Sequence, residues 1–89
     1  MFFKRRDTLS RVMIVQTKYE QEYIRFGLKV QYYRKLRGLT QEAFADKIGK
    51  SWSYLAKIES PTRAFGVSME TLFTIADALD VPVSRLFEE

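Results

Sequence analysis

Residues 38–59 read GLTQEAFADKIGKSWSYLAKIE, and this stretch predicts two short helices joined by a tight turn. Thr40 can cap a first helix over residues 41–48, because its side-chain oxygen can accept a backbone N–H that the first turn leaves unpaired. Gly49 is typical of the position just after a helix, where the chain enters the left-handed region. A second helix is then expected, with Ser51 as its cap.

The apolar residues of this stretch give each short helix one side to bury. Phe44 and Ile48 stand four apart, and Leu55 and Ile58 stand three apart, so each pair shares a helix face. Ala45 allows the two backbones to approach closely. Two short helices packed in this way form a helix-turn-helix.

The flanking sequence continues the helical pattern. We expect a helix from about residue 20 to 37, ended by Gly38, then a helix capped by Ser68 and running to residue 80. A short final helix over residues 83–87 completes five. No strand is needed in this core, so the predicted fold class is all-α.

The residues LTQEAFADKIGKS followed by SYLAKIE resemble the phage-repressor family of helix-turn-helix proteins, the Cro and cI type. The resemblance extends over roughly residues 24 to 87. It implies a lambda repressor-like DNA-binding domain, which we assign to residues 23–89, with residues 1–22 as an N-terminal extension. In this family the second helix of the motif enters the major groove of double-stranded DNA, and the first crosses the backbone.

Composition excludes several functions. The 89 residues fit a single domain, and the 46% apolar content suits an ordered chain. Cysteine and histidine are both absent, which removes thiolate and imidazole metal ligands and nucleophiles. We therefore expect no enzyme, no metal and no cofactor. No apolar run approaches the roughly 20 residues that span a bilayer, so no membrane association is expected and the predicted location is the cytoplasm, at the nucleoid.

Charge is unevenly distributed along the chain. Residues 29–63 hold eight basic residues and three acids, a net charge of +5, whereas residues 64–89 hold one arginine and five acids, a net charge of −4. The positive part coincides with the helix-turn-helix, which suits phosphate neutralisation. On charge alone, the alternative is an exposed helix that its lysines and arginines merely solvate.

Three residues of the second short helix are candidates for contact with DNA bases: Trp52, Ser53 and Lys57. Lysine can donate to guanine O6 and N7, and serine can bond to several base edges. The indole of Trp52 has one donor and no acceptor, so it would pack on a thymine methyl group or a sugar. The alternative is that Trp52 closes the core or a protein interface.

Five polar residues are candidates for phosphate contacts: Gln41, Ser51, Ser60, Thr62 and Arg63. Gln41 stands at a helix N-terminus, where free N–H groups can hold a phosphate, and the family uses this glutamine in that way. For the residues after the second helix, the alternative is an ordinary polar loop. The resemblance also implies a structural ion pair between Arg34 and Glu59.

Two positions depart from the family pattern. Lys50 occupies a turn position that is usually apolar, so either its stem covers the small core or the turn is looser. The loop over residues 60–67 is about two residues longer than usual. The extra length could displace Arg63 from the DNA, or it could equally send the Ala64–Phe65–Gly66 turn outward as a contact for a partner.

The N-terminal extension allows several interpretations. Leu9, Val12 and Met13 fit helical spacing, yet residues 12–15 equally suit a short strand. The extension could pack on the domain, form a dimer or be disordered. It could also reach DNA as a basic arm. The basic residues of such an arm would be Lys4, Arg5, Arg6 and Arg11.

The sequence favours a sequence-specific DNA-binding transcriptional regulator, a repressor that acts as a homodimer, because one recognition helix reads too few base pairs for a unique site. Leu86, Phe87 and exposed apolar residues of the fourth helix or the N-terminus are the expected dimer surface. One alternative is an antitoxin that represses its own promoter and holds a toxin, or another regulator, through the N-terminus or the Phe65 turn. Another is a protein-interaction module on the same fold.

Overall fold

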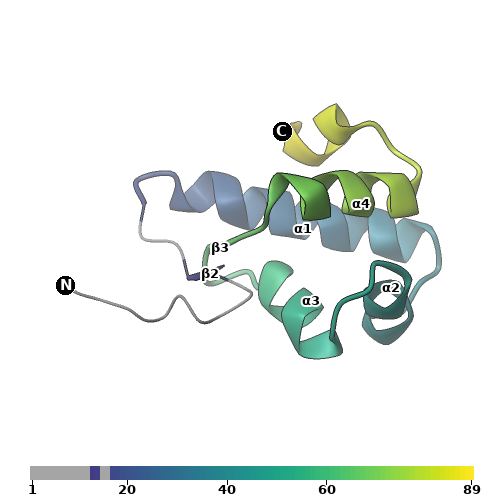
Figure 1. The fold of residues 1–89 in the computed structure, drawn as a ribbon. Helices are drawn as coiled ribbons and strands as arrows, with labels where there is room; N and C mark the ends of the chain where they lie inside the picture. Colours follow the sequence, from purple (N-terminus) through teal and green to yellow (C-terminus); the bar gives the residue numbers. More distant parts are fainter. Residues whose placement is uncertain (1–12, 15–16) are drawn as a thin grey trace.

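The computed structural model describes residues 13–14 and 17–89 and shows four α-helices, one 3-10 helix and one pair of very short strands (Figure 1). The elements in chain order are β2 (Met13–Ile14), α1 (Glu20–Leu36), α2 (Gln41–Lys47), α3 (Trp52–Ile58), β3 (Phe65–Gly66), α4 (Met69–Leu79) and η2 (Val83–Phe87). The bounds of the four α-helices agree with the sequence-based expectations to within a residue. No helix within these described ranges is long and apolar enough to cross a membrane.

The predicted caps begin three of the helices. The side-chain oxygens of Thr40, Ser51 and Ser68 each accept a hydrogen bond from the backbone N–H three residues further on, at 3.0 to 3.1 Å. Each bond pairs one of the N–H groups that a first helical turn leaves free. The starts of α2, α3 and α4 are therefore determined by local side-chain chemistry.

Three of the helices are followed by a residue in the left-handed backbone conformation. Gly38 and Gly49 have φ values of 75° and 73°, as expected for glycines that follow a helix. Asp80 ends α4 with a φ of 58°, a conformation that a short polar side chain tolerates better than most.

The Arg37 guanidinium donates to the carbonyl oxygens of Leu79 and Asp80, at 2.8 and 3.2 Å. This arginine ties the end of α1 to the end of α4.

One expectation about secondary structure was confirmed in part, and another was wrong. The fifth helix is a 3-10 helix, because the five residues after Pro82 form a piece too short for a regular α-helix. A strand pair also exists, since Met13 lies opposite Gly66 and Ile14 opposite Phe65 in an antiparallel register. The strand interpretation therefore applies to residues 13–14, while Leu9, Val12 and the basic residues Lys4, Arg5, Arg6 and Arg11 lie outside the described part of the chain.

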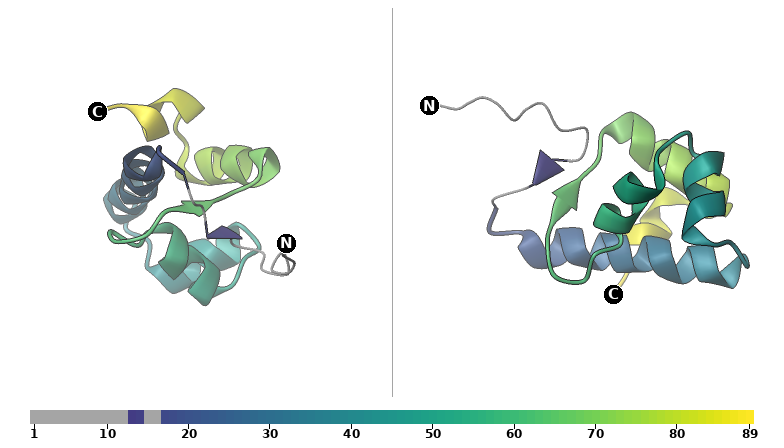
Figure 2. Two further views of the ribbon diagram at one scale, coloured as in Figure 1. Left: turned by 90° about the vertical axis from the view of Figure 1, so that its left-hand side faces the viewer. Right: turned by 90° about the horizontal axis from the view of Figure 1, so that it is seen from below.

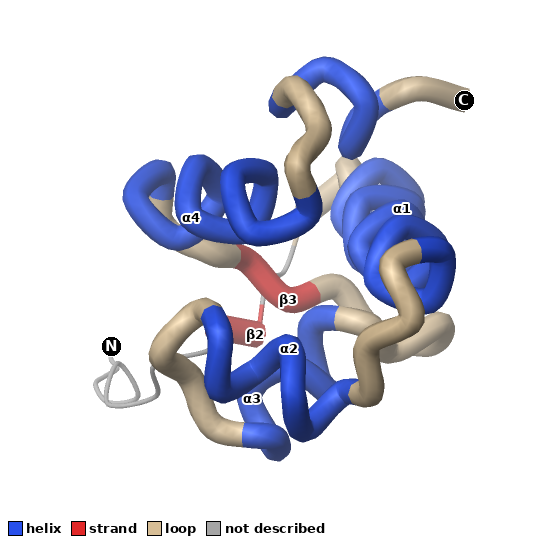
Figure 3. Tube along the Cα trace, turned by 90° about the vertical axis from the view of Figure 1, so that its right-hand side faces the viewer, coloured by secondary structure: helices blue, strands red, loops and turns tan. Residues whose placement is uncertain are grey.

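The helices enclose one apolar core. Viewed along α1 and α4, these two helices lie on opposite sides of the fold, with α2 and α3 on one side of them and η2 on the other (Figures 2 and 3). The largest fully buried apolar side chains are Phe44, Leu55, Ile75, Leu79, Leu86 and Val30.

Two segments expected at interfaces are buried instead. Leu86 is completely buried, so it cannot contribute to a dimer surface. Phe65 and Ala64 are 8% and 2% exposed, because the pairing of β3 with β2 turns this segment inward. The expectation of an outward Ala64–Phe65–Gly66 turn was therefore wrong.

Helices α1 and α3 come unusually close at Gly27. A β-carbon at this position would overlap the carbonyl oxygen of Ile58 at the end of α3. Only glycine lets the two backbones approach this closely. The contact fixes the angle at which α3 leaves the core, and so positions the outer face of that helix.

Candidate nucleic-acid interface

The outer face of α3 is open to solvent while its inner face is buried. Tyr54, Leu55 and Ile58 point into the core, and Trp52 on the other side is 58% exposed. Ser53 and Lys57 are also exposed, and they lie four residues apart and so on one face. The structure thus brings together all three residues that the sequence proposed as base readers.

Ala56 completes this outer face, although the sequence analysis did not single it out. It is exposed and lies one turn after Trp52 and Ser53. A small side chain here lets α3 approach a partner closely, and an alanine methyl group can contact a thymine methyl. Its helical spacing from Ser53 was the signal that could have identified it.

A chain of hydrogen bonds connects the exposed end of α3 to the interior. The Trp52 Nε1–H donates to Gln41 Oε1 at 2.9 Å, and Gln41 Nε2 donates to Glu59 Oε1 at 3.0 Å. The Arg34 guanidinium in turn donates to both carboxylate oxygens of Glu59, at 2.7 and 3.0 Å. We call these four residues the clamp network.

The inner end of the clamp network is buried. Arg34 and Glu59 are 5% and 2% exposed, and the remaining Nη1 of Arg34 donates to the Leu39 carbonyl at 2.7 Å. A buried ion pair is favourable only when further hydrogen bonds satisfy both groups, as they do here. The structure therefore brings together the two residues expected to form an ion pair, and adds Gln41 to them.

The clamp network holds the Gln41 amide in one orientation. Its oxygen faces the indole and one N–H faces Glu59, which leaves the second N–H of Nε2 available. The single donor of Trp52 is already used by Gln41, so only the ring itself is available to a ligand. Ser51 lies beside them and uses its oxygen to cap α3, but its hydroxyl hydrogen can still be donated.

The other phosphate candidates lie at the far end of α3. Ser60 and Thr62 share a hydrogen bond between their hydroxyls at 3.2 Å, and the Thr62 N–H donates to Ser60 Oγ at 3.3 Å. Thr62 and Arg63 are exposed, and Ser60 is half-buried. The seven residues of α3 separate this loop from Ser51 by about 10 Å, whereas the Gln41 side chain is bonded to Glu59 beside the loop.

Lys50 accommodates its unusual turn position through an aromatic contact. Its ammonium lies 5.1 Å from the centre of the Tyr54 ring, within the range of a cation–π interaction. Burial raises the pKa of Tyr54, and a hydrogen bond with the Thr71 side chain partly offsets this, so Tyr54 stays a neutral core residue. The lysine stem therefore covers the core while the charge stays at the surface.

Among the residues that the structure describes, no cluster of three or more acidic, histidine or cysteine side chains could hold a metal ion. The chemistry available at α3 is therefore hydrogen bonding, positive charge and apolar contact. Lys47, Lys50, Lys57 and Arg63 supply the positive charge on and around the two short helices. This combination suits recognition of an anionic polymer.

Comparison with known proteins places this geometry in a family. The sequence matches the HTH_3 helix-turn-helix family over residues 30–86. An immunity repressor protein of Bacillus phage phi105 is 40% identical over 63 residues, which are 71% of this chain and 42% of that protein. The chain therefore spans less than half the length of this relative.

Solved structures agree with the sequence match. The restriction-modification controller protein C.AhdI from Aeromonas hydrophila has a TM-score of 0.67 and 31% identity, over 75% of this chain and 98% of the other. SinR, a master regulator for biofilm formation solved in complex with DNA, has a TM-score of 0.64 and 32% identity, over 71% and 98%. These findings confirm the predicted resemblance. Because the family match covers more than half of the sequence and both helices of the motif, the chain belongs to the HTH_3 family of Cro/cI-type helix-turn-helix transcriptional regulators, which are DNA-binding proteins and not enzymes.

Proposed function

We propose that this protein is a sequence-specific DNA-binding repressor of the cytoplasm that reads the major groove with α3. The observation that carries the proposal is the outer face of α3, which presents Trp52, Ser53 and Lys57 while the clamp network bonds Trp52 at the start of the helix and Glu59 just after its end. The similarity to a phage immunity repressor and to a DNA-bound regulator supports this function. The proposal includes no membrane association and no cofactor.

Each residue of the outer face has a role that follows from its chemistry. Lys57 donates to guanine O6 and N7, and Ser53 bonds to a neighbouring base edge. Trp52 contacts a thymine methyl group or a sugar through its ring, because its N–H is bonded to Gln41. Sequence preference therefore comes mainly from Lys57.

Phosphate contacts are proposed on both sides of the reading face. At one end, the free N–H of Gln41 and the Ser51 hydroxyl donate to a phosphate near the start of α2 and α3. At the other, Ser60, Thr62 and Arg63 bind a second phosphate. Ser51 and the loop after α3 lie about 10 Å apart, and attachment at both would set the register of α3 in the groove.

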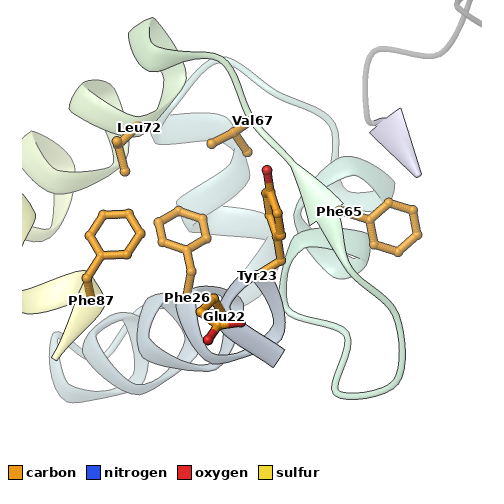
Figure 4. A pocket seen from close by; sticks show the side chains of 7 residues that line it. All are labelled: Glu22, Tyr23, Phe26, Phe65, Val67, Leu72 and Phe87. Carbon is orange, nitrogen blue, oxygen red and sulfur yellow. The ribbon is translucent and has the colours of Figure 1, made fainter. Parts of the chain in front are cut away.

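The proposed regulator acts as a homodimer, so that two α3 helices read two half-sites. An apolar pocket of about 240 Å³ provides a surface for the second subunit (Figure 4). Phe87 and Tyr23 at this pocket are 55% and 36% exposed, while its other apolar lining residues, Phe65, Val67 and Leu72, are buried or half-buried. Phe87 therefore remains a dimer candidate, while the buried Leu86 does not.

The antitoxin alternative loses one of its two contact surfaces. The Phe65 segment that was to hold a toxin is buried against β2 and the core. The other surface, the N-terminal extension, lies largely outside the described residues. We therefore propose only the regulator.

Two alanine variants test the proposed reading and positioning roles. We expect Lys57→Ala to lower affinity for the preferred duplex by about 1–3 kcal/mol and to relax preference at one base position. Gln41→Ala should weaken preferred and random duplexes alike, because phosphates carry no sequence information. Binding would be measured by fluorescence anisotropy at low and high salt, after selection of a preferred site from random duplex.

The matched control is Glu42→Ala, which removes an exposed side chain beside Gln41 that lies outside the clamp network. Equal losses from Lys57→Ala on preferred and random duplexes would assign Lys57 to phosphate. Binding that is absent, or that does not weaken as salt rises, would contradict the whole proposal.

A further inference from the structure

The outward side of α1 carries a cationic, partly apolar hollow that the proposed DNA contacts do not use. The hollow has a volume of about 230 Å³ and is lined by Arg25, Leu28, Lys29 and Tyr32. Leu28 and Tyr32 are 39% and 57% exposed, so two apolar side chains lie next to the two cations at the surface. We call these four residues the α1 hollow.

The outward side of α4 carries the opposite charge around a single aromatic residue. Phe73 is 50% exposed, and Glu70 and Asp77 lie three residues before it and four after it, on the same helix face. Met69, 64% exposed, extends the apolar area. We call Glu70, Phe73 and Asp77 the α4 knob.

Within the described ranges, the charged side chains of neither surface take part in a salt bridge. The salt bridges there join Arg34 to Glu59 and Arg85 to Glu88, and involve neither surface. The hollow spans residues 25–32 and the knob residues 70–77, so each covers two helical turns, about 10 Å. The two surfaces therefore match in length and are opposite in charge.

The positions of the two surfaces determine how they could meet. Helices α1 and α4 lie to the two sides of the fold in Figures 2 and 3, and the hollow and the knob are built on exposed side chains of these helices, so we expect the knob not to reach the hollow of its own chain. Pairing of two hollows, or of two knobs, would bring like charges together, which is unfavourable. Only the knob of one copy and the hollow of another are complementary.

We propose that copies of this chain associate head to tail, with Phe73 of one copy inserted into the α1 hollow of the next. Glu70 and Asp77 then face Arg25 and Lys29. Such a contact is heterologous, so it does not close after two subunits and links copies, or the dimers proposed above, into longer assemblies. It does not depend on DNA binding, and it uses a surface separate from the pocket at Phe87.

The test uses the full chain without DNA, in sedimentation equilibrium at about 50 mM and about 500 mM salt, because exposed charge pairs are screened at the higher concentration. We expect species larger than a dimer at low salt that disappear at high salt. Arg25→Glu/Lys29→Glu and Glu70→Lys/Asp77→Lys should each weaken this association on the order of tenfold. Phe73→Ser should weaken it without any change of charge.

The decisive sample is an equimolar mixture of the two charge-reversed variants. The first variant keeps a native anionic knob and the second a native cationic hollow, while the two altered surfaces also have opposite charges. The mixture should therefore regain the large species that each variant alone has lost. Lys47→Glu is the matched control to Lys29→Glu, because it reverses one exposed charge on α2, away from both surfaces.

Circular dichroism verifies that each variant is folded. A mixture that fails to regain the large species would overturn the proposal, as would a wild-type chain that never exceeds a dimer. If the wild-type chain forms the head-to-tail species but does not bind DNA, the proposed function is overturned and the head-to-tail contact is not.

Discussion

Trp52 shows how one exposed side chain can serve DNA binding without reading a base through hydrogen bonds. Its N–H is directed to Gln41, which in turn is bonded to the buried Glu59. The indole thereby orients the amide that is proposed to hold a phosphate. Its ring remains free for apolar contact, so the two parts of the side chain have separate effects.

Two substitutions separate these effects. Trp52→Phe keeps an aromatic ring but removes the donor, so we expect affinity for all duplexes to fall by about 0.5–1.5 kcal/mol with the base preference unchanged. Trp52→Ala removes the ring as well and should alter the base preference. Anisotropy titrations against preferred and single-base-changed duplexes measure both. A changed preference in the phenylalanine variant would show that the N–H itself meets DNA.

The buried carboxylate of Glu59 is the residue of the clamp network on which the fold depends most. Glu59→Gln removes its charge while keeping its shape, and so leaves the Arg34 guanidinium buried without a counter-charge. We expect the free energy of unfolding in urea to fall by about 3–5 kcal/mol. The exposed Glu42→Gln should change it by less than about 0.5 kcal/mol. Equal small effects would mean that water reaches the Arg34 site.

At the scale of elements, the approach of α1 to α3 sets the direction of the reading helix. Gly27 lies against the carbonyl of Ile58, and the buried Arg34 further along α1 is bonded to Glu59, the residue after α3. Helix α1 therefore holds the C-terminal end of α3 at two points. The N-terminal end is held by Gln41 of α2 through Trp52.

Gly27→Ala tests the first of these points. Within an ordinary helix this change would stabilise the chain by about 0.5–1 kcal/mol, because glycine is a poor helix former. Here the added β-carbon overlaps backbone atoms that cannot rotate away, and overpacking costs about 1–3 kcal/mol. We expect net destabilisation in urea and weaker DNA binding. Gln31→Ala on the same helix is the control, and a gain in stability from Gly27→Ala would show that α1 can shift away from α3.

At the scale of the whole molecule, charge is separated between the DNA-facing part and the C-terminal part. Lys47, Lys50, Lys57 and Arg63 lie on and around α2 and α3, and five acids against one arginine lie on α4 and beyond it. The acidic part would be repelled by DNA, so this separation favours binding through α3. The pocket at Phe87, the α1 hollow and the α4 knob lie outside α3, so they remain available for contacts between copies.

The dimer surface at Phe87 gives a prediction at this scale. Phe87 stacks on Phe26 at 5.4 Å between ring centres yet stays half-exposed, so its loss should cost the monomer little. We expect Phe87→Ala to sediment as a monomer in about 500 mM salt, where the head-to-tail contact is screened. Phe73→Ala should remain a dimer under the same conditions. A Phe87→Ala protein that is still dimeric would place the dimer surface elsewhere.

Local chemistry made much of the helix-turn-helix predictable. The caps Thr40 and Ser51 and the turn glycine Gly49 act on backbone groups within a few residues of themselves, so the sequence alone determined where α2 and α3 begin and end. The same spacing placed Ser53 and Lys57 on one outer face. These features need no knowledge of the rest of the chain.

Only the tertiary structure decided the features that depend on approach between distant segments. The bond from Trp52 to Gln41, the overlap that requires Gly27, and the pairing of β3 with β2 all join residues that no local pattern relates. The burial of Leu86 likewise depends on how η2 packs against the core. The sequence by itself determined the helices and their faces, because hydrogen bonds within a few residues set them. Packing across the core decided which of those faces stay exposed and how α3 is held.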